Sequence, residues 1–388
     1  MHTLVNYYVN DLNSKGLILW LAHTSVLVEQ ALDTLTKVWA VLGKGGANIY
    51  RLYGGYNFSG DSNGFVFSTF DKLLSLKKAN SISYDFIKNN VSVIVVDEVH
   101  RAVAPKIKEC LKDLMVLYNN CDRKLIGLTA TIGRSNTEVS ENYKIVDMFD
   151  GNIIKIDVNI LNKINFPEKI AEIKNSSDRD IIHYLQKRKI LSKLEREELE
   201  YQNYMNQDEL NELLSEISAR GRSKPEFSAK IVAKLAINRR RNEAIIRKIQ
   251  KLHEERKPTI VFACSVSHAK LLSAILFAKG IKNSLVYGDQ SIKEKSEAIE
   301  AFKNANNDIN IIINYEVLTT GFDSTNIECV LITRPTKSIV LYSQMIGRGL
   351  RGPLMGGNER CLLVDVKDNL ESYTDESAAF NYFDSYWE

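Results

Sequence analysis

Residues 91–100, which read VSVIVVDEVH, constrain the fold of this chain more than any other stretch. Four consecutive apolar residues at 93–96 predict a short strand that is buried on both faces of a parallel sheet. The run ends in Asp97 and Glu98, and open α/β sheets bind their ligands at the carboxyl ends of their strands. Two carboxylates there suit nucleotide hydrolysis, because Asp97 could hold Mg²⁺ through its water shell and Glu98 could polarise the water that attacks a phosphate. Taken alone, the pair also fits a strand that ends in a solvated acidic turn.

The composition narrows the class of protein. A chain of 388 residues has room for two or three domains. Its 51 basic and 48 acidic residues nearly balance, so a nucleic-acid-binding surface would have to be local. The five cysteines form no Cys-x-x-Cys pair, which argues against a zinc site or a disulfide framework and predicts a reducing, cytoplasmic location. No apolar run approaches membrane-spanning length, and no signal-peptide pattern opens the sequence.

Two further motifs follow the acidic one, LTAT at residues 128–131 and QMIGRGLRG at residues 344–352. In this order and spacing the three motifs resemble those of the superfamily 2 helicases, in the DEVH variant of the DEAD/DEAH-box branch. The likeness runs from about residue 17 to the C-terminus, and the last motif and the tail are most similar to restriction- and repair-type members. The resemblance implies an α/β fold class with two RecA-like parallel-sheet lobes, at residues 1–150 and 236–388, and a helical linker or insert at residues 151–235.

The resemblance also implies an activity, an ATP-dependent nucleic-acid helicase or translocase that hydrolyses ATP between its two lobes. Its cofactors would be ATP and Mg²⁺, its partner nucleic acid, DNA rather than RNA, and it would not act at a membrane. The implied catalytic residues are Asp97 (also the Mg²⁺ ligand, through water), Glu98, His100, Gln344, Arg348 and Arg351. Gly321 and Asp323 would face the nucleotide, and Thr129 and Thr131 would couple ATP hydrolysis to domain movement. The implied nucleic-acid contacts are His23, Thr24, Ser68, Thr69, Ser265, Thr319 and Thr320.

Several of these residues have a simpler interpretation. His23 and Thr24 could merely begin a helix, since Thr is a good N-cap residue. Thr129 and Thr131 follow a predicted strand, where threonines commonly cap and turn the chain.

Arg348 and Arg351 are three apart, so on a helix they would share a face and could converge on one anion. Guanidinium groups placed in this way stabilise a transferring phosphoryl group.

The sequence departs from the family pattern at its start. Relatives carry a glycine-rich phosphate loop ending in Gly-Lys-Thr directly before the helix that here begins at Met1. The Gly-Lys-Gly-Gly at residues 43–46 follows a helix and lacks the hydroxyl residue, so it predicts a helix-ending turn. The first lobe is therefore expected to be N-terminally truncated. Two alternatives follow: a truncated or mis-started helicase, or a hydrolysis-deficient relic that binds nucleic acid, acts as a scaffold or depends on a second polypeptide for the loop.

The apolar spacing predicts the remaining elements. Residues 178–217 are highly charged and predict a long amphipathic helix, residues 220–225 a flexible joint, and residues 380–387 an aromatic tail on the second lobe. Strands are predicted at 17–24, 49–55, 65–70, 124–131 (buried), 259–263, 283–287, 309–314, 329–333 and 361–368, and helices at 1–12, from 25, and at 71–76, 106–118, 230–254, 265–279 and 292–304.

Overall fold

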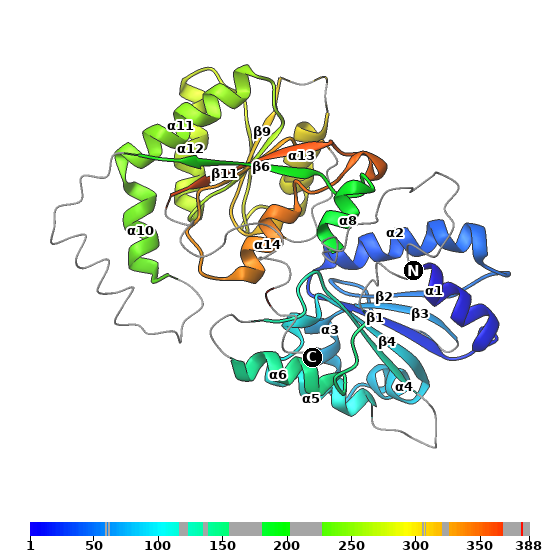
Figure 1. The fold of residues 1–388 in the computed structure, drawn as a ribbon. Coiled ribbons are helices and arrows are strands. Elements are labelled where there is room, and N and C mark those ends of the chain that lie inside the picture. Colours follow the sequence, from blue (N-terminus) through cyan, green and yellow to red (C-terminus); the bar gives the residue numbers. More distant parts are fainter. Residues whose placement is uncertain are drawn as a thin grey trace. The chain divides into compact units, whose positions relative to one another are not determined.

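The computed structural model describes residues 1–367 and 382, with gaps at 59, 61–62, 116–122, 135–138, 155–180, 202–226, 305, 307 and 320–325. The predicted joint, the predicted tail and most of the predicted charged helix lie outside the described residues. The chain forms two compact units, one made mainly of Met1–Arg134 and Ser140–Asn152, the other of residues that follow (Figure 1). In the described part of the chain, no helix is long and apolar enough to cross a bilayer.

The first unit is built on a five-stranded sheet in the order β2-β3-β1-β4-β5, and every neighbouring pair of strands is parallel. All carboxyl ends therefore lie at one edge of the sheet. The strands are β1 (Leu17–Ala22), β2 (Ile49–Leu52), β3 (Gly64–Thr69), β4 (Val91–Asp97) and β5 (Lys124–Leu128). The helices are α1 (His2–Asn6, continued by a π-helical turn at Tyr7–Asp11), α2 (Ser25–Leu42), α3 (Phe70–Lys78), α4 (Ile82–Asn90), α5 (Pro105–Met115) and α6 (Val139–Met148).

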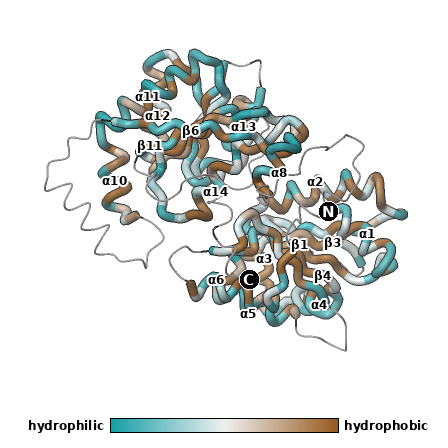
Figure 2. The backbone as a smooth tube through the Cα atoms, viewed as in Figure 1, coloured by the Kyte–Doolittle hydropathy of each residue, from teal (hydrophilic) through white to brown (hydrophobic). Residues whose placement is uncertain are grey.

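The central strand β1 is apolar throughout because helices cover both of its faces. Leu17, Leu19 and Leu21 pack in one cluster with residues of α3, α4 and α5. Ile18 and Trp20 pack in a second cluster with residues of α1 and α2. Figure 2 shows the resulting hydrophobic centre around β1. This is the alternation expected of a strand buried between two helical layers.

The last strand of this sheet, β5, differs from its prediction. We expected it to be buried, but β5 lies at the edge of the described sheet, and Ile126 and Leu128 are 37% and 39% exposed. An apolar run does not reveal whether a strand has neighbours on one side or on two. The turn predicted at residues 43–46 is confirmed, since α2 ends at Leu42 and the Gly43 N–H bonds to the Trp39 carbonyl.

The second unit is built on a six-stranded sheet in the order β6-β11-β10-β7-β9-β8, again parallel throughout. Its strands are β6 (Lys193–Leu199), β7 (Thr259–Phe262), β8 (Ser284–Val286), β9 (Ile311–Asn314), β10 (Cys329–Ile332) and β11 (Arg360–Val366). Its helices are α8 (Ile181–Lys187), α10 (Ala229–Ile237), α11 (Arg239–Glu254), α12 (Val266–Ala278), α13 (Ile292–Lys303) and α14 (Ile339–Gly347). The two units thus have the parallel α/β architecture of two RecA-like lobes.

The prediction of a helix across residues 193–199 is wrong. This segment is β6, which pairs in register with β11 over its whole length. Its sequence, KLEREEL, has the charge pattern of a solvated helix, but the charges pair across the structure: Glu195 with Arg360, and Glu197 with Lys248 at 2.6 Å. Tertiary pairing with β11 therefore overrides the local preference of the segment.

Candidate active site

The carboxyl edge of the first sheet gathers the polar residues that the motifs singled out. Thr69 ends β3, and His23 and Thr24 follow β1. Asp97 ends β4 and Thr129 follows β5 directly. Because the strands are parallel and adjacent, residues up to about a hundred positions apart in sequence lie along one edge.

The acidic pair sits at a strained turn. Glu98 has φ 50° and ψ 55°, the left-handed conformation that costs non-glycine residues energy and that clusters at functional sites. In this conformation the Glu98 N–H donates to Asp97 Oδ1 at 3.0 Å. Burial raises the pKa of Asp97, and this backbone hydrogen bond opposes the rise. The carboxylate of Asp97 is therefore poorly solvated, and a cation beside it would stabilise its charged form.

His100 joins the two strand ends. Its Nδ1 lies 3.2 Å from Thr129 Oγ1 and 3.3 Å from Glu98 Oε2, and the ring is buried. Burial, helped by the charge of Arg101, lowers the pKa of His100 to about 3, so the ring is neutral at neutral pH. Its contact with Glu98 is therefore not an ion pair between opposite charges.

The protons of this network can be assigned from its geometry. The Thr129 hydroxyl donates its single proton to the Thr131 carbonyl at 2.6 Å, so towards His100 it acts as acceptor. His100 then carries its proton on Nδ1 and donates it to Thr129 Oγ1, and Glu98 Oε2 lies 3.3 Å from the same nitrogen. The Thr131 N–H also donates to Thr129 Oγ1, at 3.2 Å. The end of β4 is in this way linked to the segment after β5.

The residues at this edge fit a magnesium nucleotide. Mg²⁺ is usually held by one or two carboxylates together with water and phosphate oxygens, and Asp97 and Glu98 supply hard oxygen ligands. Asp97 is half-buried at the carboxyl end of β4 with Glu98 next to it, so two carboxylates lie where parallel sheets bind their ligands. Among the residues that the structure describes, no group of three or more His, Cys, Asp or Glu side chains forms a metal cluster.

Of the predicted nucleic-acid contacts in the first unit, one does not fit its surroundings. Ser68 is fully buried and its hydroxyl bonds to the Leu52 carbonyl at 3.0 Å, so it faces the interior and not a phosphate. Thr24 caps α2, accepting a hydrogen bond from Leu27 N at 3.4 Å, as its simpler interpretation requires. Thr69 stands at the start of α3 and its side chain makes no capping hydrogen bond.

In the second unit, Ser265 caps α12 by accepting a hydrogen bond from His268 N at 3.1 Å. Thr319 is buried and its hydroxyl donates to the Glu316 carbonyl at 2.6 Å, so this side chain does not point to a ligand either. The predicted residues Thr320, Gly321 and Asp323 lie outside the described part of the chain.

The two arginines of the last motif do not share a helical face. Helix α14 ends at Gly347, with Gln344 nearly buried within it and Arg348 as the C-cap residue. Arg351 lies beyond the helix, in an antiparallel bridge with Leu191. The prediction from helical spacing is wrong because the chain turns at the glycines of this motif to meet the segment before β6. Burial lowers the pKa of Arg351.

The segment before β6 contributes a residue that the sequence did not reveal. Ser192 is fully buried, and its hydroxyl lies 2.6 Å from the Arg351 carbonyl and 2.7 Å from the Asn358 carbonyl. The Gly352 N–H donates to the Ile190 carbonyl at 2.9 Å. Residues 190–192 therefore hold the backbone at Arg351 in place. A serine within a charged segment carries no pattern that could have predicted this role.

Comparison with known proteins agrees with this architecture. Residues 2–134 match the family model described as "Type III restriction enzyme, res subunit", and residues 241–352 match the "Helicase conserved C-terminal domain". The chain is similar to the putative ATP-dependent helicase IRC3 of Saccharomyces cerevisiae, with 26% identity over 354 residues, which are 91% of this chain and 43% of the relative. The chain thus spans less than half the length of that relative.

Two solved structures share the fold at low sequence identity. One is Dbp5 of S. cerevisiae bound to RNA and ADP BeF3, which superposes with a TM-score of 0.55 at 13% sequence identity. The match covers 98% of this chain and 78% of the Dbp5 chain. The helicase MrfA, bound to DNA and AMPPNP, has a TM-score of 0.54 at 15% identity, covering 98% of this chain and 46% of its own. With the acidic motif at the end of β4 and the two family models in this order along the chain, the findings fit a DEAD/DEAH-type superfamily 2 helicase.

Proposed function

We propose that this chain is the motor part of an ATP-dependent helicase or translocase that acts on nucleic acid, and on DNA rather than RNA. The observation that carries the proposal is the network in which His100 connects Glu98, at the end of β4, with Thr129, after β5. A carboxylate held by a buried, neutral histidine is a positioned base and not a solvated turn residue.

Each residue of the network has a separate task. Glu98 orients and polarises the attacking water, and the His100 N–H fixes the direction of the Glu98 carboxylate. Asp97 holds the magnesium ion through its water shell. When bound, Mg²⁺ neutralises negative charge on the phosphates. A movement of Glu98 would reach the segment after β5 through His100, whose hydrogen bond to Thr129 depends on the positions of both side chains. Thr129 is in turn bonded to the Thr131 carbonyl.

The nucleic acid is proposed to meet the first unit at Thr69, His23 and the start of α2, and the second at the start of α12. Backbone N–H groups and hydroxyls at helix N-termini suit phosphate oxygens, and such contacts position a strand without reading its sequence. The likeness of residues 2–134 to a restriction enzyme subunit supports DNA as the substrate. MrfA, a structural neighbour, is bound to DNA, whereas Dbp5 is bound to RNA.

Three earlier inferences belong to this proposal. Arg348 and Arg351 are proposed to act on the phosphates of the nucleotide, each from its own position, since they do not lie on one helix. The division into lobes at residues 1–150 and 236–388 is retained as a proposal, although residues 193–199 of the intervening segment pair with β11. The cytoplasmic location stays a prediction.

The test is ATP hydrolysis by the chain with and without single-stranded DNA or RNA of the same sequence. The matched variant is Glu98→Gln, which keeps the size of the side chain and removes its charge. We expect hydrolysis stimulated more by DNA than by RNA, and its loss in Glu98→Gln with nucleotide binding retained. Hydrolysis that persists unchanged in Glu98→Gln would show that another residue activates the water.

A second candidate function is a nucleic-acid-binding or scaffolding module that does not hydrolyse ATP by itself. This function predicts no hydrolysis but retained binding of single-stranded DNA, with an affinity that falls steeply as salt rises.

A further inference from the structure

A pocket opens at the carboxyl edge of the second sheet, where three adjacent strands end. Ser265 lies just after β7, Tyr315 follows β9, and Arg334 lies just after β10. Together with residues of α10 and α12 they line a cavity of about 480 Å³. Of the predicted nucleic-acid contacts only Ser265 lies in the lining, and the acidic motif contributes no residue to it.

The lining combines aromatic rings with cations. The Arg334 guanidinium carbon lies 5.2 Å from the centre of the Tyr315 ring, and the same guanidinium pairs with Glu316 at 2.8 Å. Phe227, which precedes α10, also lines the pocket, and the Lys337 ammonium lies 5.0 Å from the centre of its ring. Unstacked bases of single strands bind to such aromatic and guanidinium surfaces, and nearby cations attract their phosphates.

The rim of the pocket is fixed before any ligand binds. His268 Nδ1 accepts a hydrogen bond from the Cys264 N–H at 3.2 Å, and its Nε2 donates to Asn242 Oδ1 at 3.0 Å. Asn242 in turn donates to the Ala236 carbonyl at 2.8 Å, at the end of α10. Burial lowers the pKa of His268 to about 3, so the ring stays neutral and keeps Nδ1 as an acceptor. A preformed pocket loses little entropy on binding.

We propose that this pocket takes one unstacked base of the bound nucleic-acid strand, with Tyr315 as its stacking surface and Arg334 beside it. The inference rests on the proposed nucleic-acid function and adds a base-binding site to it. Pockets of about 300–1,000 Å³ hold small planar ligands. Stacking is indifferent to base identity, so the site anchors the strand without reading its sequence.

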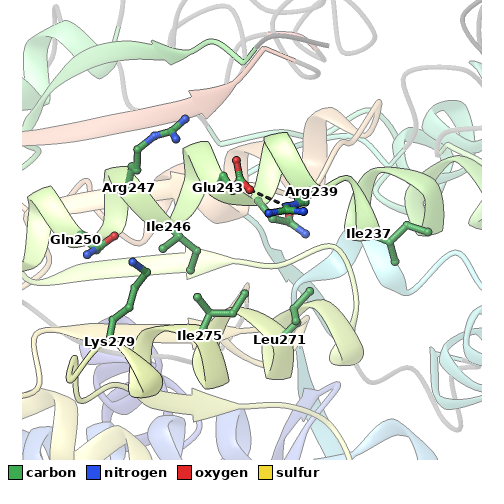
Figure 3. A pocket seen from close by; sticks show the side chains of 10 residues that line it. Ile237, Arg239, Glu243, Ile246, Arg247, Gln250, Leu271, Ile275 and Lys279 are labelled. Carbon is green, nitrogen blue, oxygen red and sulfur yellow. Dashed lines mark hydrogen bonds and ion pairs between the residues drawn. The ribbon is translucent and has the colours of Figure 1, made fainter. Parts of the chain in front are cut away.

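A neighbouring groove, shown in Figure 3, lacks the aromatic residues that line the proposed base pocket. It lies between α11 and α12 and has a volume of about 580 Å³, but no aromatic residue lines it. Its side chains alternate between apolar residues such as Ile246 and Ile275 and charged ones, and Arg239 pairs with Glu243 at 2.9 Å. Arg239 therefore provides a control position with the same type of charge as Arg334 in a groove that no aromatic residue lines.

The test combines variants with an abasic scan. The probe is a single-stranded oligonucleotide of mixed sequence, trimmed to the shortest length that still binds so that it has one binding register. Its affinity is measured with one abasic position moved along it, for the unaltered chain, Tyr315→Leu and Tyr315→Phe. We expect Tyr315→Leu to weaken binding about tenfold, since stacking contributes about 1–3 kcal/mol per base. Tyr315→Phe, which keeps the ring, stays within twofold. The unaltered chain loses affinity mainly at one abasic position, and in Tyr315→Leu that position no longer matters.

The charge of the site is tested separately. Arg334→Gln is expected to weaken binding severalfold more than Arg239→Gln, which removes the same charge at the neighbouring groove.

Should Tyr315→Leu not fold, a fluorescent 2-aminopurine scan of the unaltered chain decides the question, because a base in the pocket changes its emission at one position only.

The outcomes separate the two proposals. If single-stranded DNA binds in a salt-dependent way but the abasic and fluorescence scans are flat, or Tyr315→Leu binds as the unaltered chain does, the base pocket is refuted and the nucleic-acid function stands. If neither DNA nor RNA binds, both proposals fall.

Discussion

Replacing Thr129 with Val tests the network at the acidic motif, because it changes one hydroxyl to a methyl group and little else. The Thr129 hydroxyl donates to the Thr131 carbonyl at 2.6 Å and accepts from the Thr131 N–H and from His100 Nδ1, each at 3.2 Å. In Thr129→Val all three hydrogen bonds are lost. The contact between His100 and Glu98, at 3.3 Å, remains.

The size of the effect follows from what each group loses. A neutral hydrogen bond contributes about 0.5–1.5 kcal/mol net, and a buried donor left without an acceptor costs about 1–3 kcal/mol. Thr129 is half-buried, so water reaches the Thr131 backbone groups and restores part of that cost. His100 is buried and keeps its second acceptor. We therefore expect the free energy of unfolding to fall by about 1.5 kcal/mol.

Urea unfolding followed by tryptophan fluorescence measures this change. Trp20 and Trp39, both in the first unit, make the signal sensitive to that unit. The matched control is Thr34→Val, where an exposed hydroxyl bonds to the Gln30 carbonyl in the middle of α2. A decrease below about 0.5 kcal/mol, or one equal to that of Thr34→Val, would refute the proton assignment at His100.

Three further predictions concern other parts of the structure. Burial lowers the pKa of His100 to about 3 from 6.5, so the unfolded chain binds the extra proton; stability from this group is complete above pH 6.5 and falls as the pH drops towards 3, by about 1.4 kcal/mol per pH unit. His100→Gln should flatten that slope in urea unfolding at several pH values, and an unchanged slope would contradict the assignment. In Gly349→Ala the new Cβ would lie 2.4 Å from Cys361 Sγ, so we expect a loss of about 1–3 kcal/mol in thermal unfolding, whereas Gly347→Ala meets nothing within 4 Å and should be close to neutral. Tyr342→Phe removes a buried 2.6 Å hydrogen bond to Asp365 and should lower the free energy of unfolding by about 1.5–3 kcal/mol; an effect under about 0.5 kcal/mol would show that Asp365 finds another donor.

The acidic motif shows how far the sequence alone could lead. The apolar run at 93–96 predicted a buried strand and the two carboxylates predicted a site at its end, and β4 ends at Asp97. A strand or helix exposes its residues to the core at a fixed spacing, so the positions of the apolar residues in the sequence predict that element. The proton on His100 Nδ1 could not be predicted, because it depends on Thr129, which is 29 positions away in sequence and directly follows another strand, β5.

The predictions that the structure contradicts also failed because the outcome depends on residues outside the local segment. KLEREEL at residues 193–199 has a helical pattern of charges, and only pairing with β11 makes it a strand. Arg348 and Arg351 have helical spacing, but the helix ends at Gly347. Ser68 was predicted to face a ligand, and its hydroxyl is instead bonded to the neighbouring strand β2.

The amino-acid sequence was enough to predict the fold class, the order of most strands and helices along the chain, and the resemblance of its motifs to those of the superfamily 2 helicases. These properties follow from local periodicity and from residue types at fixed spacing. The tertiary structure decided which hydroxyls face inward, which strands lie at an edge, and that Ser265, Tyr315 and Arg334 line one pocket. These features depend on the order of the strands in the sheet, which brings residues that are distant in sequence together. That order cannot be predicted from the sequence of any single segment.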